Sequence, residues 1–214
     1  MIDFIDFGCG IGGSIEWAKA KFGGETHLGI DNRINEIQIA TSKGFNVIFG
    51  DITSEEIKLP QCRYITMLHF LEHLKNEQQV EKIIEKAMKL ANEFIYIKVP
   101  FFDATEYLKN LGFRLTWTNW IGHTTNVTAE MLKKIINKFS IQAEIGYLQP
   151  ILNSKSNEII PVDAPVDTIV YNELLGEKKY IEFEEVYRET CCLININCQR
   201  FEELKKIINY KKVI

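Results

Sequence analysis

The sequence predicts an α/β protein built on a doubly wound, mostly parallel sheet with an antiparallel strand near the C-terminus. Short apolar segments alternate with amphipathic ones through residues 1–100. This pattern is typical of strands that are covered by helices on both faces of a sheet. A glycine-rich turn follows the first apolar segment, where a strand should pass into a helix. A length of 214 residues with 46% hydrophobic residues suits a single domain over 1–214.

The first half of the chain supplies five strands and three helices. The first strand, Ile2–Phe7, ends in the glycine loop Gly8–Gly13, and Ser14 is a candidate N-cap for a helix over Ile15–Phe22. Hydrophobic periodicity then predicts, in order, strand His27–Ile30, helix Asn35–Lys43 closed by Gly44, strands Asn46–Phe49 and Tyr64–Leu68, helix Glu77–Leu90 and strand Phe94–Val99.

After Pro100 the pattern is less regular. Residues 101–126 are rich in aromatic side chains, and residues 149–176 carry three prolines and resemble an insertion. We expect both segments to cover a substrate, whereas residues 1–100 form the cofactor-binding half. The remaining elements are a helix Ala129–Phe139 capped by Thr128, a strand Ile141–Tyr147, a long strand Tyr180–Asn197 and a helix Phe201–Tyr210.

Composition narrows the classes of partner. The net charge is −4 and the lysine pairs are scattered, so nucleic acid is not an expected partner. No stretch approaches the ~20 apolar residues that span a bilayer, and the N-terminus has no signal-peptide pattern. The five cysteines form no C-x-x-C pair, as expected of free thiols in a reducing compartment. We therefore expect a cytoplasmic protein, of an oligomeric state that the sequence leaves open.

The glycine loop indicates a nucleoside ligand. Gly8, Gly10 and Gly13 satisfy the dinucleotide pattern G-x-G-x-x-G. Asp31 follows at the distance where an acidic residue would bind a ribose. Glycines at such a turn let the backbone approach a ligand closely, next to the free N–H groups of a helix start. The loop alone fits a nicotinamide dinucleotide as well as other nucleosides.

Three further segments favour one family. The glycine loop with Gly29-Ile30-Asp31 resembles motifs I and II of the class I, Rossmann-like S-adenosylmethionine-dependent methyltransferases. Gly50-Asp51-Ile52 resembles the adenine-binding acidic turn of that family, and residues 65–74 resemble its motif IV in the form Leu-Glu-His-Leu. The resemblance covers Ile2 to about Pro100, and the four segments in order favour a methyltransferase over a nicotinamide enzyme.

The resemblance implies a role for each cofactor residue. Asp6 and Gly8 would meet the methionine part of S-adenosyl-L-methionine, and Asp31 would accept hydrogen bonds from the ribose hydroxyls. Asp51 would take the adenine amino group while Ile52 packs on the ring, although an aspartate after Gly50 also suits a plain turn. The full implied set is Asp6, Gly8, Gly10, Gly12, Asp31, Asp51, Ile52 and His69.

Four side chains are candidates for the chemistry. His69, Glu72 and His73 follow the fourth strand, and His123 lies in the aromatic segment after the fifth. The group is similar to the metal sites of ubiquinone-pathway O-methyltransferases, which carry E-x-x-E-H, and of small-RNA 2′-O-methyltransferases, which add a later histidine. Here His69 stands where both have glutamate. All four are candidate ligands of a divalent metal, with Mn, Fe or Zn favoured over Mg. Metal-free catalytic histidines and a packing role are the alternatives.

The acceptor is predicted by elimination. Positioning dominates methyl transfer, and a hydroxyl acceptor also needs help to lose its proton. Because clustered Arg and Lys are lacking, we expect O-methylation of a small hydroxylated metabolite or a glycan or nucleotide-sugar precursor. RNA 2′-O-methylation and a non-catalytic, nucleoside-binding partner subunit are the alternatives.

Overall fold

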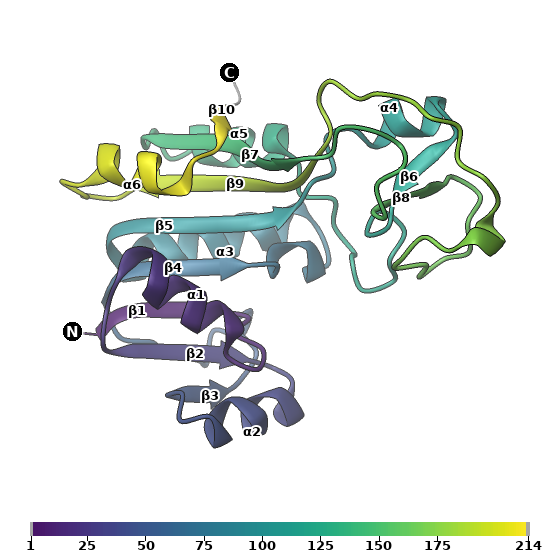
Figure 1. Cartoon of the computed structure of the whole chain (residues 1–214). Coiled ribbons are helices and arrows are strands. Elements are labelled where there is room, and N and C mark those ends of the chain that lie inside the picture. The colour runs from purple at the N-terminus through teal and green to yellow at the C-terminus, as the bar shows by residue number, and fades with distance from the viewer. Residues whose placement is uncertain (1, 213–214) are drawn as a thin grey trace.

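The computed structural model describes residues 2–212, which form one eight-stranded sheet, a two-stranded sheet and helices (Figure 1). The larger sheet has the order β10-β7-β9-β5-β4-β1-β2-β3. In chain order the elements are β1 Ile2–Phe7, α1 Gly13–Phe22, β2 His27–Asp31, α2 Ile34–Ser42, β3 Val47–Phe49, β4 Cys62–Leu68, η1 Leu71–His73, α3 Glu77–Leu90, β5 Ala91–Pro100, α4 Thr105–Asn110, β6 Phe113–Leu115, α5 Ala129–Asn137, β7 Ala143–Pro150, β8 Ile159–Pro161, η2 Glu173–Leu175, β9 Tyr187–Asn195, α6 Phe201–Ile208 and β10 Lys211–Lys212.

Strand direction confirms the predicted fold class. Strands β1 to β5 pair in parallel, whereas β9 runs antiparallel to both β5 and β7. Strand β10, which the sequence did not predict, adds an antiparallel pair outside β7. In a parallel sheet the carboxyl ends of neighbouring strands meet at one edge, and this edge is where ligands bind in open α/β sheets.

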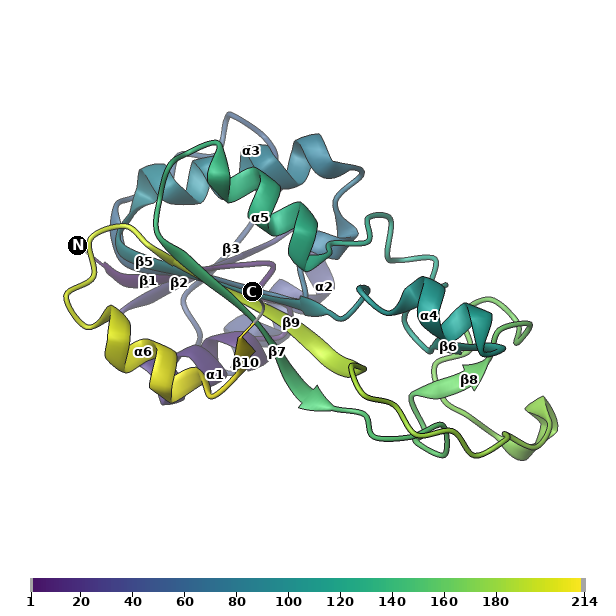
Figure 2. The ribbon, with the colours of Figure 1, turned by 90° about the horizontal axis from the view of Figure 1, so that it is seen from above.

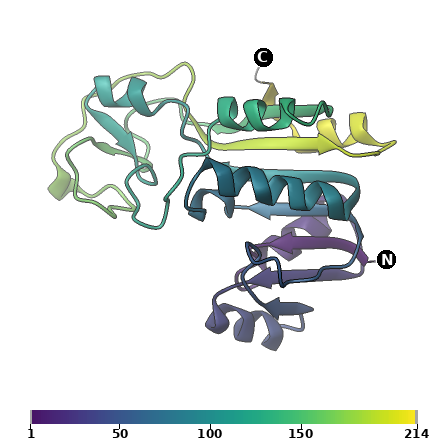
Figure 3. The same ribbon diagram turned by 180° about the vertical axis from the view of Figure 1, so that it is seen from behind.

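Helices cover both faces of the sheet. In Figure 2, α3 and α5 lie on one face, and α1 and α6 lie on the other. Two separate apolar cores match these layers. The first includes Ile83 of α3 and Leu132 of α5, and the second includes Ile15 of α1 and Leu204 of α6. Figure 3 shows the molecule from behind, so that this first face is toward the viewer and α3 lies in front of β4 and β5.

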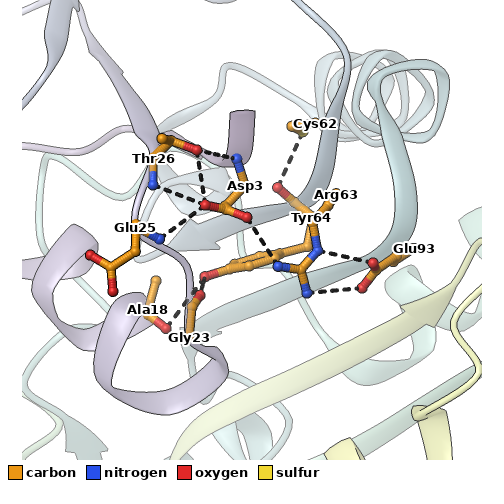
Figure 4. Close-up of polar contacts among 9 residues, drawn as sticks. All are labelled: Asp3, Ala18, Gly23, Glu25, Thr26, Cys62, Arg63, Tyr64 and Glu93. Carbon is orange, nitrogen blue, oxygen red and sulfur yellow. Dashed lines mark hydrogen bonds and ion pairs between the residues drawn. The ribbon is translucent and has the colours of Figure 1, made fainter. Parts of the chain in front are cut away.

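A polar network ties the amino ends of three central strands together (Figure 4). Arg63 at the start of β4 pairs with Asp3 of β1 at 3.0 Å and with Glu93 of β5 at 3.0 Å. The Tyr64 hydroxyl donates to the Gly23 carbonyl at 2.6 Å. The network lies at the end of the sheet opposite the carboxyl ends, so its role is to hold strand starts in register.

Two sequence predictions need correction. Ser14 does not cap α1: Gly12 precedes the helix, and the Ser14 hydroxyl donates instead to the Asp6 carboxylate and the Cys9 carbonyl. The long strand predicted from Tyr180 begins only at Tyr187. Residues before it bend away from the sheet because their backbone is used elsewhere, as when the Phe183 N–H donates to the Leu152 carbonyl at 2.8 Å.

The two irregular segments of the chain form one lobe. Strand β6, from residues 101–126, pairs antiparallel with β8, from residues 149–176. Apolar side chains from both segments build a third core, which includes Phe101, Leu108 and Ile159. In Figure 1 this lobe projects beyond the carboxyl ends of the central strands. Among the described residues, no helix has the length and apolar character needed to cross a membrane.

Two buried cations hold the lobe together. The Lys178 ammonium donates to the Ser156 carbonyl at 2.6 Å and the Ile159 carbonyl at 2.9 Å, and it lies 4.0 Å from the Tyr171 ring centroid. Arg114 donates in the same way to the Pro165 carbonyl at 2.9 Å. Because the lobe has little regular secondary structure, these side chains satisfy carbonyl groups that a sheet or helix would otherwise satisfy.

We expect Lys178→Met to loosen the lobe and leave the main sheet intact. The substitution removes the Lys178 donor from the Ile159 and Ser156 carbonyls, of which the second keeps the Ile159 N–H at 3.1 Å, and we expect a cost of ~1–3 kcal/mol. Hydrogen exchange should accelerate in residues 153–180 and remain unchanged in β1, β4 and β5. Lys179→Met, at the exposed neighbouring position, is the control. Equal exchange in both variants would contradict the role given to Lys178.

Candidate functional site

The turn between β1 and α1 brings backbone N–H groups to the carboxyl edge of the sheet. Gly8 and Gly12 have φ angles of 76° and 94°, in the left-handed region that favours glycine. A Cβ atom would also lie 2.6 Å from the Phe70 ring at Gly8 and 2.3 Å from the Phe45 ring at Gly12. Both positions therefore need glycine for conformation and for space.

The end of β2 is joined to this turn. The N–H groups of Gly8 and Cys9 both donate to the Ile30 carbonyl, at 2.9 and 3.1 Å. The Gly10 N–H donates to Asp31 Oδ2 at 2.9 Å. Burial by itself would raise the pKa of Asp31, but hydrogen bonds from Arg33 and Gly10 outweigh it and hold the pKa below its ordinary value. Asp31 is therefore a carboxylate at neutral pH.

Asp6 lies beneath the glycine loop. Its side chain is fully buried, and it accepts hydrogen bonds from Ser14 and, at 2.5 Å, from the Thr66 hydroxyl. Burial raises the pKa of Asp6 to about 7, although the two hydroxyl groups act in the opposite direction. Asp6 thus fixes the loop from below.

A cleft of about 340 Å³ opens above the ends of β1, β2 and β3. Of the predicted cofactor residues, Gly8, Asp31, Asp51, Ile52 and His69 line it, and Asp6, Gly10 and Gly12 do not. Asp51 forms a local turn, in which its Oδ1 accepts from the Thr53 N–H at 2.9 Å. Ile52 is buried in the first core. Asp51 therefore forms the plain turn that its position after Gly50 suggested, and it also lines the cleft.

The segment after β4 carries three of the candidate side chains. His69 has a φ of 52°, an unusual backbone conformation for a residue other than glycine, asparagine or aspartate. Its N–H donates to the Lys98 carbonyl at 2.7 Å, which holds the turn against β5. The short helix η1 follows, turning Glu72 into the protein and leaving His73 exposed.

Threonine hydroxyls bring His123 to this segment. Thr124 and Thr125 both donate to the Leu74 carbonyl, at 2.7 and 2.5 Å. The Thr125 N–H donates to the Glu72 carbonyl at 3.1 Å. These bonds fasten residues 122–125 of the lobe onto η1, and the ring centroids of His73 and His123 lie 5.1 Å apart as a result.

Glu72, His73 and His123 form a compact group. One ligand atom from each lies within 4.8 Å of the others. Glu72 is fully buried, and neither carboxylate oxygen has a hydrogen-bond partner among the described residues. Its ionic contact is with the His69 ring, whose Nδ1 lies 3.5 Å from Glu72 Oε1. A buried carboxylate without hydrogen bonds is costly and is normally held by a closer cation.

Each of the two histidines is held through its Nδ1 atom. His73 Nδ1 lies 2.7 Å from the Gly122 carbonyl, and His123 Nδ1 lies 2.9 Å from the Trp117 carbonyl. Because a carbonyl oxygen only accepts, each Nδ1 carries the proton and each Nε2 has a lone pair. Burial also lowers the pKa of His123, which favours the neutral ring. Metal-binding histidines are commonly oriented in this way, and the three side chains fit a divalent ion.

His69 does not join the group of candidate ligands. Its Nε2 lies 2.8 Å from Glu189 Oε1 of β9, and its Nδ1 lies 3.5 Å from Glu72 Oε1. Lys98 also pairs with Glu189, at 2.9 Å. Burial disfavours a charge on His69, but the two carboxylates prevail and raise its pKa to about 9. His69 is therefore an imidazolium at neutral pH, which does not bind metal.

Sequence reasoning missed Glu189. Its strand is antiparallel and far from the motifs in sequence, so only the pairing of β9 with β5 brings it to the site. A single acidic residue in an apolar strand, between Arg188 and Thr190, is the one signal that points to it.

A second cleft of about 650 Å³ lies between the sheet edge and the lobe. Glu72, His73 and His123 line it together with Trp117, Trp120 and Ile169 of the lobe. The Trp120 ring lies beside the two histidines, with its centroid 4.5 Å from that of His123 and 5.8 Å from that of His73. Arg33, His69 and His73 border both clefts. A molecule in each cleft would therefore meet the other next to the histidine cluster.

No family model and no curated sequence matches the chain. Its fold is nevertheless shared by solved structures of methyltransferases. A SAM-dependent methyltransferase from Archaeoglobus fulgidus aligns with a TM-score of 0.61 and 18% identity, over 91% of this chain and 86% of that one. Magnesium protoporphyrin IX methyltransferase from Synechocystis PCC 6803, with bound SAH, aligns at 0.54 and 15%, over 91% and 74%. The methyltransferase domain of bacterial CtHen1 aligns at 0.56 and 12%, over 90% and 89%.

The buried carboxyl of Asp6 predicts a specific pH dependence of stability. Its pKa is raised from 3.8 to about 7, so the folded state keeps a proton that the unfolded state has lost between those pH values. The contribution is fully present below pH 4 and is lost as the pH rises through 7. Between pH 5 and pH 8, Asp6 should cost the wild type roughly 2–3 kcal/mol in its free energy of unfolding.

Urea denaturation of Asp6→Asn at both pH values tests this. The variant should lose less stability than the wild type over that range, whereas Asp163→Asn, at an exposed position of the lobe, should follow the wild type. An Asp6→Asn variant with the wild-type pH dependence would show that Asp6 is ionised throughout.

Proposed function

We propose that this protein is an S-adenosylmethionine-dependent methyltransferase that methylates a hydroxyl oxygen of a small acceptor. The observation that carries the proposal is the junction of the two clefts. The cleft over the glycine loop and Asp31 suits a nucleoside, and the second cleft suits an acceptor. They share His69 and His73 as a common border, where a methyl group would pass from one ligand to the other.

The cofactor assignment rests on the chemistry of the first cleft. Asp31 is an ionised acceptor suited to a ribose diol. The glycine turn lets the ligand approach the backbone at Gly8, and Ile52 offers an apolar contact for the adenine ring. The fold shared with methyltransferase structures supports this assignment. Asp6 would then hold the glycine loop in place and make no contact with the ligand.

Glu72, His73 and His123 would hold a divalent metal ion. Two imidazoles with one carboxylate suit manganese, iron or zinc. Glu72 is buried without a hydrogen bond among the described residues, and its ionic contact with His69 is long at 3.5 Å, which supports a cation at this place. When bound, such an ion would lower the pKa of the acceptor hydroxyl. His69, the fourth residue of the predicted set, would instead bridge Glu189 and Glu72 and reduce the repulsion between these two carboxylates.

The residues themselves would position the acceptor and receive its proton. Methyl transfer from a sulfonium depends mainly on in-line alignment of the acceptor oxygen. Without a bound ion, the Nε2 atom of His73 or His123 could instead accept the hydroxyl proton, because each Nδ1 is engaged with a carbonyl oxygen. Trp117 and Trp120 also line the cleft, and the Trp120 ring packs edge-on against His123, where it would help to position the acceptor.

Charge pairing supports a small, weakly charged acceptor. The guanidinium of Arg188 in the acceptor cleft pairs with Glu158 at 2.7 Å, and that of Arg33 pairs with Asp31 at 2.9 Å. Neither is held ready for a phosphate backbone, which disfavours RNA. Trp117 and Trp120 could stack on a sugar or aromatic ring, as in a glycan or nucleotide-sugar precursor. A buried Glu72 without a hydrogen bond among the described residues would be a cost without benefit in a non-catalytic binding subunit.

Ligand binding should stabilise the folded protein. We expect S-adenosylhomocysteine at 100 times its Kd to add about 2.7 kcal/mol to the free energy of unfolding, because it binds the folded state alone. Asp31→Ala should remove most of the increase in Tm, and Asp163→Ala should retain it. Differential scanning fluorimetry measures both. A shift with NAD and none with S-adenosylhomocysteine would reject the methyltransferase proposal.

Glu72→Gln should separate stability from function. It removes a buried carboxylate that has no hydrogen bond among the described residues, while His69 keeps its shorter contact with Glu189, so the metal-free variant should not have a lower Tm than the wild type. The same variant should lose the binding of manganese or zinc in calorimetry, and turnover should fall ~10²-fold or more, as it should for His123→Ala. Glu106→Gln, on the exposed surface of the lobe, is the control. Full turnover after exhaustive chelation would contradict the metal site and would assign the chemistry to His73 and His123 alone.

A further inference from the structure

The carboxylate of Asp31 is already saturated with hydrogen bonds. A carboxylate offers about four lone-pair positions. At Oδ1 these are taken by the Arg33 N–H at 2.9 Å and Arg33 Nε at 3.0 Å. At Oδ2 they are taken by the Gly10 N–H at 2.9 Å and Arg33 Nη2 at 2.9 Å. No position is left for a ribose hydroxyl while Arg33 stays in place.

The Arg33 side chain makes the contacts that a ribose would make. Its Nε and Nη2 donate one hydrogen bond to each oxygen of Asp31, as two parallel bonds from a rigid fork. A ribose diol also donates one hydrogen bond to each oxygen of a carboxylate. The two backbone donors, from Gly10 and Arg33 itself, can remain during the exchange.

Glu36 is a second carboxylate that can hold the Arg33 guanidinium after it leaves Asp31. Arg33 Nη1 already lies 2.6 Å from Oε1 of Glu36, which is in the first turn of α2. The Arg33 side chain is 58% exposed, so it can leave Asp31 without opening the core. A Cβ at Gly10 would meet both Glu36 and Arg33 side chains, which shows that this pair lies over the glycine loop.

We propose that Arg33 is a placeholder for the cofactor ribose: its guanidinium occupies Asp31 in the free protein and moves to Glu36 when the ribose binds. This inference rests on the proposed function, since it takes Asp31 as the ribose acceptor. Only the fraction of molecules with Arg33 displaced can bind the ligand, so Arg33 lowers the apparent affinity. Asp31 in turn is never left buried and unpaired.

The first test is the affinity for S-adenosylhomocysteine, measured by calorimetry. Arg33→Ala should bind roughly three- to tenfold more tightly than the wild type, because the competing ion pair is absent. Glu36→Gln should bind more weakly, because Arg33 loses its alternative partner. Arg63→Ala is the matched control: its guanidinium also bridges two carboxylates, but at the opposite end of the sheet (Figure 4). It should bind as the wild type does.

A second pair of ligands isolates the ribose. Adenosine and 2′,3′-dideoxyadenosine are both uncharged, so the general effect of removing a cation is the same for each. Arg33→Ala should strengthen the binding of adenosine and leave that of dideoxyadenosine unchanged, in titrations followed by NMR. An equal gain for both nucleosides would mean that Arg33 only obstructs the cleft, and it would overturn the proposal.

The outcomes also separate this proposal from the proposed function. If wild type and Arg33→Ala both bind S-adenosylhomocysteine, with the variant equal or weaker, the placeholder is wrong and the cofactor site stands. If only Arg33→Ala binds, both proposals are supported. If neither binds, the cofactor assignment fails and the placeholder fails with it.

Discussion

The attachment of the glycine loop to the end of β2 is the constraint on which the rest of the site depends. The Ile30 carbonyl accepts from two consecutive loop N–H groups, and the Asp31 carboxylate accepts from Gly10. These bonds fix where β1, β2 and α1 meet. Phe45 and Phe70 then pack where side chains on the loop would have stood. Without glycine there, the loop could not lie against β2, and the first cleft would have no floor.

A similar local anchor brings together the cluster of Glu72, His73 and His123 from two segments that are distant in the sequence. Thr124 and Thr125 satisfy the Leu74 carbonyl at the end of η1, and this contact sets His123 beside His73. The carbonyls of Gly122 and Trp117 then orient the two rings. Backbone hydrogen bonds therefore determine the tautomers, and Glu72 is left as the one charged member of the group. Glu72 is buried without a hydrogen bond among the described residues, and its contact with His69 is long at 3.5 Å, so this carboxylate is the feature from which the proposed metal site is argued.

The sequence predicted the parts of the molecule that obey local rules. Alternating strands and helices up to Pro100 were predictable because their hydrophobic periods match the observed elements, and the glycine turn was predictable from its composition. Two kinds of feature were not. Ser14 has the chemistry of a helix cap, but a buried carboxylate, Asp6, competes for its hydroxyl. Glu189 and the Arg33 fork depend on strand pairing and on side-chain reach, neither of which leaves a periodic signal.

The lobe is threaded into the sheet rather than appended to it. The chain leaves the sheet after β5, returns through α5 and β7, leaves again and returns as β9, and β6 and β8 join the two excursions. A domain that hangs on one linker can swing as a rigid body. One that is tethered at both ends of two excursions would have to bend all of its connections together. The cleft between the lobe and the sheet should therefore admit a ligand by side-chain and loop movements at its rim, with the spacing between lobe and sheet held nearly constant.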